Sequence, residues 1–268
     1  MKYIFDVDGT LSFDGETIAP VINSAIDDLI AAGNEVIFAS ARPIRDLLPM
    51  IPTFTDQKLI GANGAMISID QQIRVISQID LRYYDFLKDL INEFQLDYIV
   101  DGSWNYSSRI TQESFIEKMI DPQNLAKQVT LEEIVEPIKT IFVNLDDSLQ
   151  EILMTLIKEK TTLNAIGLAG EGTVDITSQN INKAYTLDYL QVDKFVAFGN
   201  DRNDLEMLGE AQQSIWINSK PSLLNFGKKT DVICEASSEK VAKLIKILSA
   251  VSGFFTVTFL AIIPYSLK

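Results

Sequence analysis

A short apolar segment that ends in two aspartates constrains the fold of this chain more than any other feature. Residues 2–5 (KYIF) combine aromatic and β-branched side chains, which is typical of a buried strand. Asp6 and Asp8 follow directly, and Gly9 then permits a sharp turn. Open α/β sheets bind their ligands outside the carboxyl ends of the strands. The pattern therefore predicts an α/β fold whose first strand brings two carboxylates to a functional edge.

Two carboxylates this close suggest a particular chemistry. They cannot both ionise cheaply unless a cation lies between them or one keeps its proton. That arrangement suits one aspartate as a nucleophile beside a metal ion and the other as a proton donor. A strand followed by an ordinary Asp-Gly turn would give the same residues, so this segment alone leaves both interpretations open.

Two further predicted strands also end in polar residues. Residues 36–39 (VIFA) are followed by Ser40, Ala41 and Arg42, and a hydroxyl and a guanidinium are good donors to a phosphate oxygen. Residues 195–198 (FVAF) open into the sequence GNDRNDLEML at 199–208, whose acids and amides are oxygen ligands of the kind that hold Mg²⁺. Between them, Lys183 begins a helical pattern.

In this order the motifs resemble the haloacid dehalogenase-like (HAD) hydrolases, and most of all their Cof-type branch with a large cap, which includes many sugar phosphatases. The matching segments are DVDGT, ASAR where the family usually has TGR, Lys183, and GNDRNDLEML where it usually has GDxxNDxxML. Residues 61–65 (GANGA) also match the NGA turn of that branch. The resemblance covers residues 1–248, and four spaced motifs are far more specific than one.

The resemblance implies roles for individual residues. Asp6 would be the nucleophile that forms an aspartyl-phosphate, and Asp8 the general acid and then base, with its backbone carbonyl touching the metal. Ser40 would bind the phosphoryl group, and Lys183 would neutralise charge beside Asp6. These roles agree with covalent catalysis by a carboxylate and with charge neutralisation around a transferring phosphoryl group. The expected contacts to phosphate or substrate are Gly9, Ser40, Ala41, Arg42, Asn63, Lys183 and Asn203.

One position departs from the family pattern. The first aspartate of the last motif aligns with Asn200, and the second aligns with Asp204. An asparagine carbonyl is an acceptable ligand for Mg²⁺ but brings no charge. We expect the Mg²⁺ cofactor to be held by Asp6, Asp8 and Asn200, with Asp204 and the adjacent Asp201 in support. The alternative is that Asn200 marks weak metal binding and a less active protein.

Composition excludes several classes of function. The net charge is −14 without a basic tract, which argues against a nucleic-acid partner. The absence of histidine removes Ser-His-Asp triads, Cys-His dyads and His-ligated zinc. The single cysteine, Cys234, lies in an apolar segment and is expected to be a buried strand residue. No signal peptide is recognised, since the first residues enter a strand at once, and we expect a cytoplasmic enzyme.

The predicted fold is a Rossmann-like, doubly wound parallel sheet core with an inserted α+β cap. Residues 1–79 and 180–248 would form the core, and residues 80–179 the cap. Apolar spacing predicts helices over 18–32, 43–50, 81–94 and 149–159, and strands over 97–100, 139–144 and 173–177. Residues 249–267 carry no charge, so this tail could pack on the core, mediate oligomerisation or, less in keeping with its Ser, Thr and Pro content, enter a membrane.

The cap should select the substrate. Trp104, Tyr106 and Arg109 could stack on and hydrogen-bond a sugar, although a hairpin with an exposed aromatic pair is the simpler interpretation. The predicted function is a Mg²⁺-dependent phosphatase of small phosphorylated metabolites, with sugar phosphates favoured, acting as a monomer or homodimer. The alternatives are a phosphotransferase or phosphomutase of the same superfamily, a catalytically weak protein that binds phosphorylated ligands, and a membrane-anchored enzyme.

Overall fold

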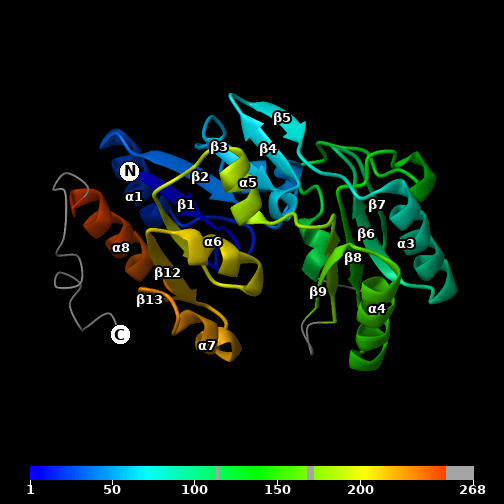
Figure 1. Cartoon of the computed structure of the whole chain (residues 1–268). Helices are drawn as coiled ribbons and strands as arrows, with labels where there is room; N and C mark the ends of the chain where they lie inside the picture. The colour runs from blue at the N-terminus through cyan, green and yellow to red at the C-terminus, as the bar shows by residue number, and fades with distance from the viewer. Residues whose placement is uncertain (113–114, 168–171, 252–268) are drawn as a thin grey trace. The chain divides into compact units, whose positions relative to one another are not determined.

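The computed structural model describes residues 1–112, 115–167 and 172–251, which form two compact units (Figure 1). The first unit comprises Met1–Ser40, Met50–Leu59 and the chain from Leu187 onward. The second comprises Ala41–Pro49 and Ile60–Thr186. The domain boundaries expected from the sequence, at 79/80 and 179/180, stay a prediction.

A parallel sheet forms the centre of the first unit. Its strands include β1 (Lys2–Phe5), β2 (Glu35–Ala39), β11 (Phe195–Gly199), β12 (Gln213–Asn218) and β13 (Val232–Glu235). They lie in the order β13-β12-β11-β1-β2, and every neighbouring pair is parallel. β1 therefore lies inside the sheet, and its residues Tyr3 to Phe5 are buried as an aromatic, β-branched strand should be. The predicted α/β fold with a parallel core sheet is confirmed.

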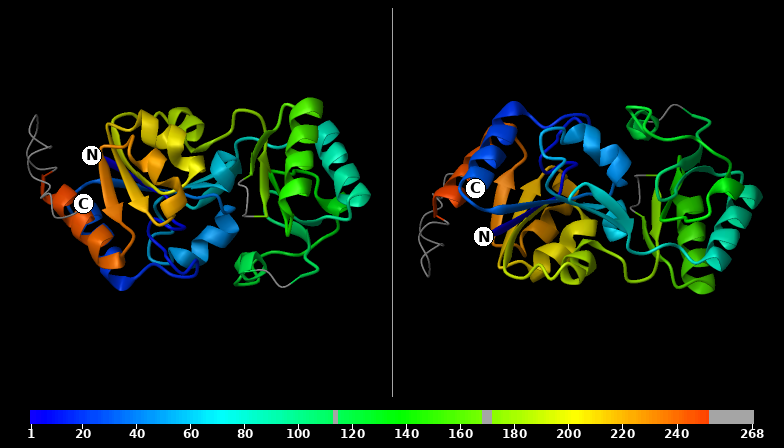
Figure 2. Two further views of the ribbon diagram at one scale, coloured as in Figure 1. Left: turned by 90° about the horizontal axis from the view of Figure 1, so that it is seen from below. Right: turned by 90° about the horizontal axis from the view of Figure 1, so that it is seen from above.

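Helices cover both faces of this sheet. α1 (Pro20–Ala31) and α8 (Ser238–Val251) lie side by side on one face, and α6 (Leu205–Glu210) lies on the other (Figure 2). α1 begins with proline at its first turn, as predicted, and buries one stripe of side chains: Ile22, Ala25, Ile26 and Leu29. α7 (Leu224–Gly227) follows β12, and Cys234 is buried in β13, where burial raises the pKa of its thiol to about 11.

The second unit is built on an antiparallel sheet of five strands in the order β7-β6-β8-β10-β9. The strands are β6 (Asp97–Asp101), β7 (Tyr106–Arg109), β8 (Lys139–Val143), β9 (Asn164–Gly167) and β10 (Val174–Thr177). α3 (Leu81–Glu93) and α4 (Asp147–Lys160) pack on one face of this sheet and form a common apolar core with it (Figure 2). The helices and strands expected for residues 81–177 are therefore present, and the sheet gains β7 and β9.

Several shorter helices and strands lie between these elements along the chain. β3 (Lys58–Gly61) leads into a turn, and β4 (Met66–Ile69) and β5 (Gln72–Val75) form an antiparallel hairpin that the sequence did not predict. α2 (Ile44–Leu47) precedes β3, and α5 (Lys183–Tyr189) follows β10. Single helical turns lie at Leu48–Met50, Ala62–Gly64, Phe115–Met119, Leu131–Glu133, Arg202–Asp204 and Pro221–Leu223.

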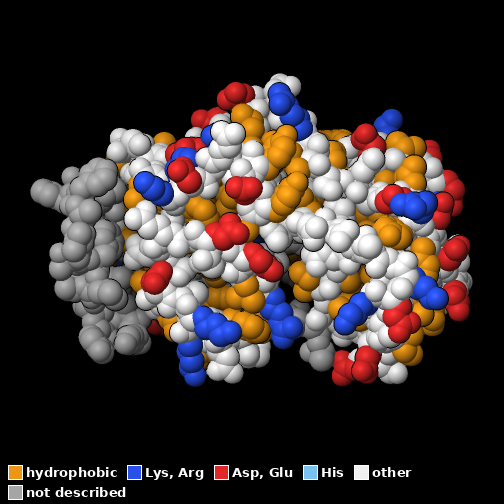
Figure 3. Space-filling view, in the orientation of Figure 1, with side chains coloured by type: hydrophobic (Ala, Val, Ile, Leu, Met, Phe, Trp, Pro, Cys, Tyr) orange, Lys and Arg blue, Asp and Glu red, His pale blue; other side chains and the backbone are white. Residues whose placement is uncertain are grey.

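Within the described residues, no helix is both long and apolar enough to cross a membrane. Of the C-terminal tail at 249–268, residues 252–268 lie outside the described part of the chain. On the face drawn in Figure 3, the described Lys and Arg side chains are scattered among Asp and Glu.

A buried ionic cluster ties α2 to the antiparallel sheet within the second unit. The guanidinium of Arg45, only 1% exposed, donates two hydrogen bonds of 2.7 Å to the Asp46 carboxylate and one of 2.9 Å to Asp101 Oδ1 in β6. It also donates to the Trp104 carbonyl at 2.8 Å and lies over the Tyr106 ring. Burial raises the pKa of the Asp101 carboxyl above its ordinary value, against the favourable charge of Arg45.

Arg45→Met should destabilise the protein strongly, because the variant would leave the Asp46 and Asp101 carboxylates buried beside each other without the cation. Breaking a buried pair in this way costs about 3–5 kcal/mol. Urea unfolding measures the loss. Adding Asp101→Asn to Arg45→Met should recover part of it, since one buried charge is removed. The matched control, Arg82→Met, breaks a pair that is exposed, and its urea midpoint should hardly move. Equal midpoints for Arg45→Met and Arg82→Met would contradict this account.

Candidate functional site

The polar residues expected at the functional edge follow parallel strands of the first unit. β1, β2, β11 and β12 end at Phe5, Ala39, Gly199 and Asn218. Because these strands run in the same direction, the residues that come next lie at one edge of the sheet: Asp6, Ser40, Asn200 and Ser219. The backbone N–H of Asp6 donates to Phe198 O at 3.0 Å, which continues the β1–β11 ladder by one residue. The structure thus brings together Asp6, Ser40 and Asn200, which stand far apart in the sequence.

The loop after β1 is a compact turn built around Val7. The backbone N–H groups of Leu11 and Ser12 donate to Val7 O at 2.9 Å, and Gly9 N donates to Ser12 O at 2.7 Å. Gly9 has a φ of +78°, and a Cβ there would clash with the side-chain amide of Asn200, on the side of the amide that faces Ser219. Glycine is therefore required both for the turn and for the close approach of Asn200.

Asn200 lies at the centre of the site and is buried. Placed with its nitrogen inward, its side-chain amide is 2.9 Å from Asp6 Oδ2 and 3.0 Å from both Asp8 O and Thr10 Oγ1. Its other amide atom lies 2.9 Å from Ser219 Oγ. The backbone carbonyl of Asp8, which the family resemblance marks as a metal contact, therefore lies beside Asn200 together with the Asp6 carboxylate.

Asp204 organises the loop that carries Asn200. Its carboxylate is fully buried, and Oδ2 accepts hydrogen bonds from the backbone N–H of Asn200 at 2.9 Å and of Asp201 at 3.0 Å. A Cβ on Gly199 would lie 2.6 Å from the Cβ of Asp204, so this packing needs glycine before the loop. Asp204 thus holds the turn from strand to helix, and its predicted support of the metal would act through this loop.

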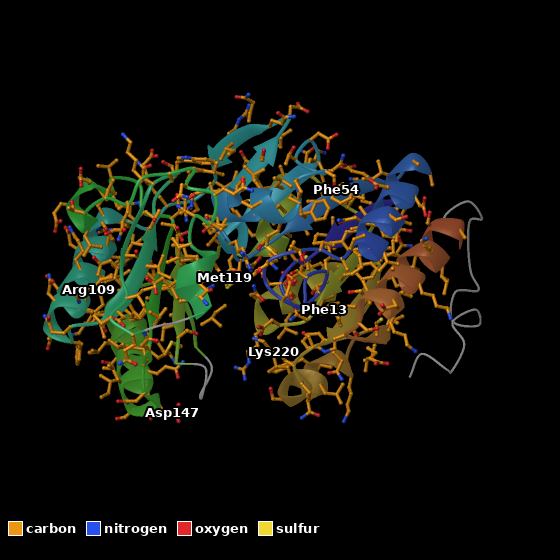
Figure 4. The ribbon with its side chains drawn as sticks, turned by 180° about the vertical axis from the view of Figure 1, so that it is seen from behind. Phe13, Phe54, Arg109, Met119, Asp147 and Lys220 are labelled. Atoms are coloured by element: carbon orange, nitrogen blue, oxygen red, sulfur yellow. The ribbon has the colours of Figure 1, made fainter. Side chains whose placement is uncertain are left out.

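Asp201 and Asn203 lie in the same turn. Asp201 accepts a hydrogen bond from the backbone N–H of Arg202 at 2.6 Å and forms an ion pair with Lys220, which follows β12 (Figure 4). The lysine lowers the charge that Asp201 could offer to a cation. Asn203 lies in the helical turn Arg202–Asp204, and its contact with phosphate stays a prediction.

The residues present fit a Mg²⁺ ion held with little protein charge. Within the described part of the chain, no group of three or more acidic, His or Cys side chains is close enough to hold a metal. However, Mg²⁺ keeps several waters and is usually bound by one or two carboxylates. Asp6 could supply one carboxylate, Asp8 a carbonyl, and Asn200 an amide oxygen if that side chain were turned.

The second unit carries the other predicted residues. Lys183 is buried at the first residue of α5. The Gly64 carbonyl accepts a hydrogen bond of 2.7 Å from Thr186 Oγ1, and a Cβ on Gly64 would lie 2.4 Å from Asn182 O. The NGA turn is therefore packed tightly against the segment that carries Lys183.

Asn63, in that turn, is buried and has a φ of +55°. Its amide donates to Asp175 Oδ2 at 3.3 Å, and the contact with phosphate or substrate that we expect for this residue stays a prediction. Arg42 is also buried. The positions of Arg42, Asn63 and Lys183 relative to Asp6 stay predictions.

Sequence reasoning missed three polar residues. Thr10 was noticed only as part of DVDGT, and Ser219 carries no signal other than its place after a strand, yet both contact the Asn200 amide. Lys139, buried at the start of β8, donates to the Ala41 carbonyl at 2.9 Å and pairs with Asp175 at 3.0 Å. Nothing in the local sequence indicates that a lysine at the first position of an apolar strand is buried.

In the second unit, Trp104, Tyr106 and Arg109 contact other residues of the same unit. Trp104 Nε1 donates to Leu125 O at 2.9 Å, and the Tyr106 ring lies under Arg45. Arg109 donates to Leu96 O at 2.7 Å and to Ile91 O at 3.4 Å, and so caps the end of α3 (Figure 4). These contacts support the simpler of the two interpretations, a hairpin without a substrate contact.

Comparisons with known proteins agree on the family and the fold. A family model described as haloacid dehalogenase-like hydrolase matches residues 3–245. No curated protein matches the chain. Among solved structures, a HAD subclass IIB sugar phosphatase, BT4131, is 19% identical with a TM-score of 0.75, over 92% of this chain and 98% of that one.

Two further solved structures are similar. A haloacid dehalogenase-like hydrolase from B. subtilis is 16% identical with a TM-score of 0.78, over 92% of this chain and 100% of that one. The phosphatase BT1666 from Bacteroides thetaiotaomicron is 20% identical with a TM-score of 0.73, over 94% of each chain. At these sequence identities, the similarity shows a shared fold and nothing more.

Asp204→Ala should destabilise the first unit, because it would leave the backbone N–H groups of Asn200 and Asp201 without their acceptor. Each buried group left unsatisfied costs about 1–3 kcal/mol. Urea unfolding of the full chain checks this. Asp193→Ala removes a carboxylate that is 83% exposed and should leave the midpoint nearly unchanged. A midpoint for Asp204→Ala equal to that of the control would mean that the loop does not depend on this carboxylate.

Proposed function

The chain belongs to the haloacid dehalogenase-like hydrolases, and from this premise we propose that it is a Mg²⁺-dependent phosphatase of small phosphorylated metabolites. The substrate class that we favour is sugar phosphates, and the route is an aspartyl-phosphate on Asp6. The observation that carries the proposal is the buried Asp6 carboxylate at the end of β1, with the Asp8 carbonyl and the Asn200 amide beside the same point.

In the first half-reaction a carboxylate oxygen of Asp6 attacks phosphorus, and the bond between phosphorus and the ester oxygen breaks. Asp8 gives its proton to the departing alkoxide, which leaves as the alcohol. Asp8 is half-buried in a loop held by the Val7 carbonyl, so its carboxyl can reach solvent and substrate while its backbone stays fixed. Splitting one difficult displacement into two is what a nucleophilic carboxylate contributes.

In the second half-reaction the Asp8 carboxylate takes a proton from water, and the resulting oxygen attacks the phosphorus of the aspartyl-phosphate. Inorganic phosphate leaves, and the Asp6 carboxylate and the protonated Asp8 are restored. Ser40, buried after β2 at the same edge, would donate a hydrogen bond to a phosphoryl oxygen. Lys183 and Arg42 would neutralise the phosphate charge, which an acidic protein needs from local cations.

Asp6, the Asp8 carbonyl and Asn200 would hold Mg²⁺, which when bound offsets the charge of the phosphoryl group. The preference for sugar phosphates rests on the Cof-type resemblance and on one similar structure that is described as a sugar phosphatase. The further expectation of a cytoplasmic monomer or homodimer is carried over from the sequence.

Two of the alternatives concern the chemistry of the site. A phosphotransferase or mutase would use the same Asp6 and Asp8, and product analysis separates it, because only hydrolysis releases inorganic phosphate. A catalytically weak binding protein is favoured by one observation, the neutral Asn200. An aryl-phosphate assay with and without Mg²⁺ decides between that protein and an enzyme.

Asp6→Asn should reduce turnover to background while the fold is retained, because the amide keeps the shape of the carboxylate but cannot attack phosphorus. Phosphate release from an aryl phosphate measures activity, and circular dichroism checks the fold. Asp27→Asn makes the same change on the exposed face of α1 and should keep full activity. Hydrolysis retained in Asp6→Asn would remove the aspartyl-phosphate from the mechanism.

Asp8→Asn should lower turnover of a sugar phosphate by at least about 100-fold, the usual scale for a general acid. The loss should be smaller for an aryl phosphate with a good leaving group, because its departure needs no proton. Steady-state rates with both substrates test this. The same loss with both would show that Asp8 does not protonate the leaving group.

A further inference from the structure

Three oxygen atoms surround the inward end of the Asn200 amide. Its inward atom lies 2.9 Å from Asp6 Oδ2, 3.0 Å from Asp8 O and 3.0 Å from Thr10 Oγ1. A carboxylate and a carbonyl can only accept hydrogen bonds. The position between Asp6 and Asp8 must therefore be filled by a group that is positive or carries protons.

The amide nitrogen meets this requirement. Turned inward, it has two N–H bonds to give to the Asp6 carboxylate and the Asp8 carbonyl, and both acceptors are within hydrogen-bond distance. With the oxygen inward instead, three oxygens would meet at about 3 Å in a buried site, which is unfavourable unless a cation is among them. The cation-free protein therefore favours nitrogen inward.

The remaining partners allow both orientations. Thr10 and Ser219 contact the two ends of the amide, and both use hydroxyl groups. A hydroxyl donates or accepts as needed. Ser219 Oγ, at 2.9 Å from the outward atom, can donate to the oxygen or accept from the nitrogen, so its hydrogen bond exists in both orientations. Thr10 Oγ1, at 3.0 Å from the inward atom, can donate to the oxygen when the oxygen faces inward, and it gives up that hydrogen bond when the two N–H bonds go to Asp6 and Asp8.

The spacing also suits a cation. An octahedral Mg²⁺ with oxygens at about 2.1 Å keeps neighbouring ligands about 3.0 Å apart. The inward atom of Asn200 already lies at 2.9 Å and 3.0 Å from the Asp6 and Asp8 oxygens. Reversal of the amide would therefore place a third oxygen at the spacing of a neighbouring Mg²⁺ ligand from both the Asp6 and the Asp8 oxygen.

We propose that Asn200 is a reversible ligand: its nitrogen faces Asp6 and Asp8 in the cation-free protein, and its oxygen faces them when Mg²⁺ is bound. The inference rests on the proposed function only for the identity of the cation. Two consequences follow. The empty site is stable without metal, and Mg²⁺ binds weakly because it must displace two hydrogen bonds and gains no charge from residue 200.

Asn200→Asp tests both consequences, because it places a second carboxylate where the amide was. Thermal unfolding of the full chain is followed in EDTA and over a Mg²⁺ titration, without substrate. In EDTA the variant should melt several degrees below wild type, since two buried carboxylates repel. Mg²⁺ should reverse the order, with half-saturation at a concentration at least about tenfold lower than in wild type, because bound ligand stabilises the folded state. A variant that folds only with Mg²⁺ gives the same support.

The control is Asn225→Asp, which adds the same charge on an exposed residue of α7. It should melt like wild type in EDTA and show the same Mg²⁺ dependence. The proposal is overturned if Asn200→Asp is as stable as Asn225→Asp in EDTA, or if its half-saturating Mg²⁺ concentration equals that of wild type.

A second measurement uses the wild-type protein. The side-chain NH₂ resonances of Asn200, assigned by their loss in Asn200→Asp with Mg²⁺ present, should shift on addition of Mg²⁺. In that step the two amide protons leave the Asp6 carboxylate and the Asp8 carbonyl, and the nitrogen turns toward Ser219 Oγ. Resonances that stay in place at saturating Mg²⁺ would overturn the reversal. Neither measurement involves turnover, so a failed phosphatase assay with these results intact would count against the proposed function alone.

Discussion

The pairing of β1 between β2 and β11 is the constraint on which the rest of the first unit depends. It joins residues 2–5 to residues 195–198 in register, with Phe5 opposite Phe198 and their rings 4.7 Å apart. Since the strands are parallel, the chain segments that follow them emerge at the same edge. Asp6 and Asn200 are brought together by this register, and a slip of one residue would turn either side chain to the other face.

At that edge the neutral Asn200 side chain lies beside a carboxylate and a carbonyl oxygen. A buried carboxylate and a carbonyl with no cation need a donor, and Asn200 provides one from a neutral side chain. The family's aspartate at this position would instead place two carboxylates together. The surrounding acids are already engaged: Asp204 accepts backbone N–H groups, and Asp201 pairs with Lys220. The site therefore carries less negative charge than its sequence, rich in aspartate, suggests.

Several features could be predicted because they depend on local patterns. The apolar run before Asp6, the Pro20 start of α1 and the spacing of α3 all lie in neighbouring residues, and the structure confirms each. The β4–β5 hairpin was missed because its strands have only four residues each, and the alternation of Gln72–Val75 is too short to stand out as a pattern. Trp104 and Arg109 were open to two interpretations, because an aromatic or cationic side chain looks the same in sequence whether it binds a ligand or a backbone carbonyl.

The sequence by itself determined the α/β class, the order of the motifs and the types of side chain available: two aspartates, a serine, a lysine and an amide-rich loop, with no histidine. These follow from composition and short-range spacing. Only the tertiary structure decided that Thr10 and Ser219 flank Asn200, that Asp204 holds a loop, and that Lys139 and Arg45 are buried with their partners. The physical reason is that hydrogen-bond partners come from strand ends and loops far apart along the chain. Which acceptors surround a given amide is settled by strand register and packing, and no local pattern encodes it.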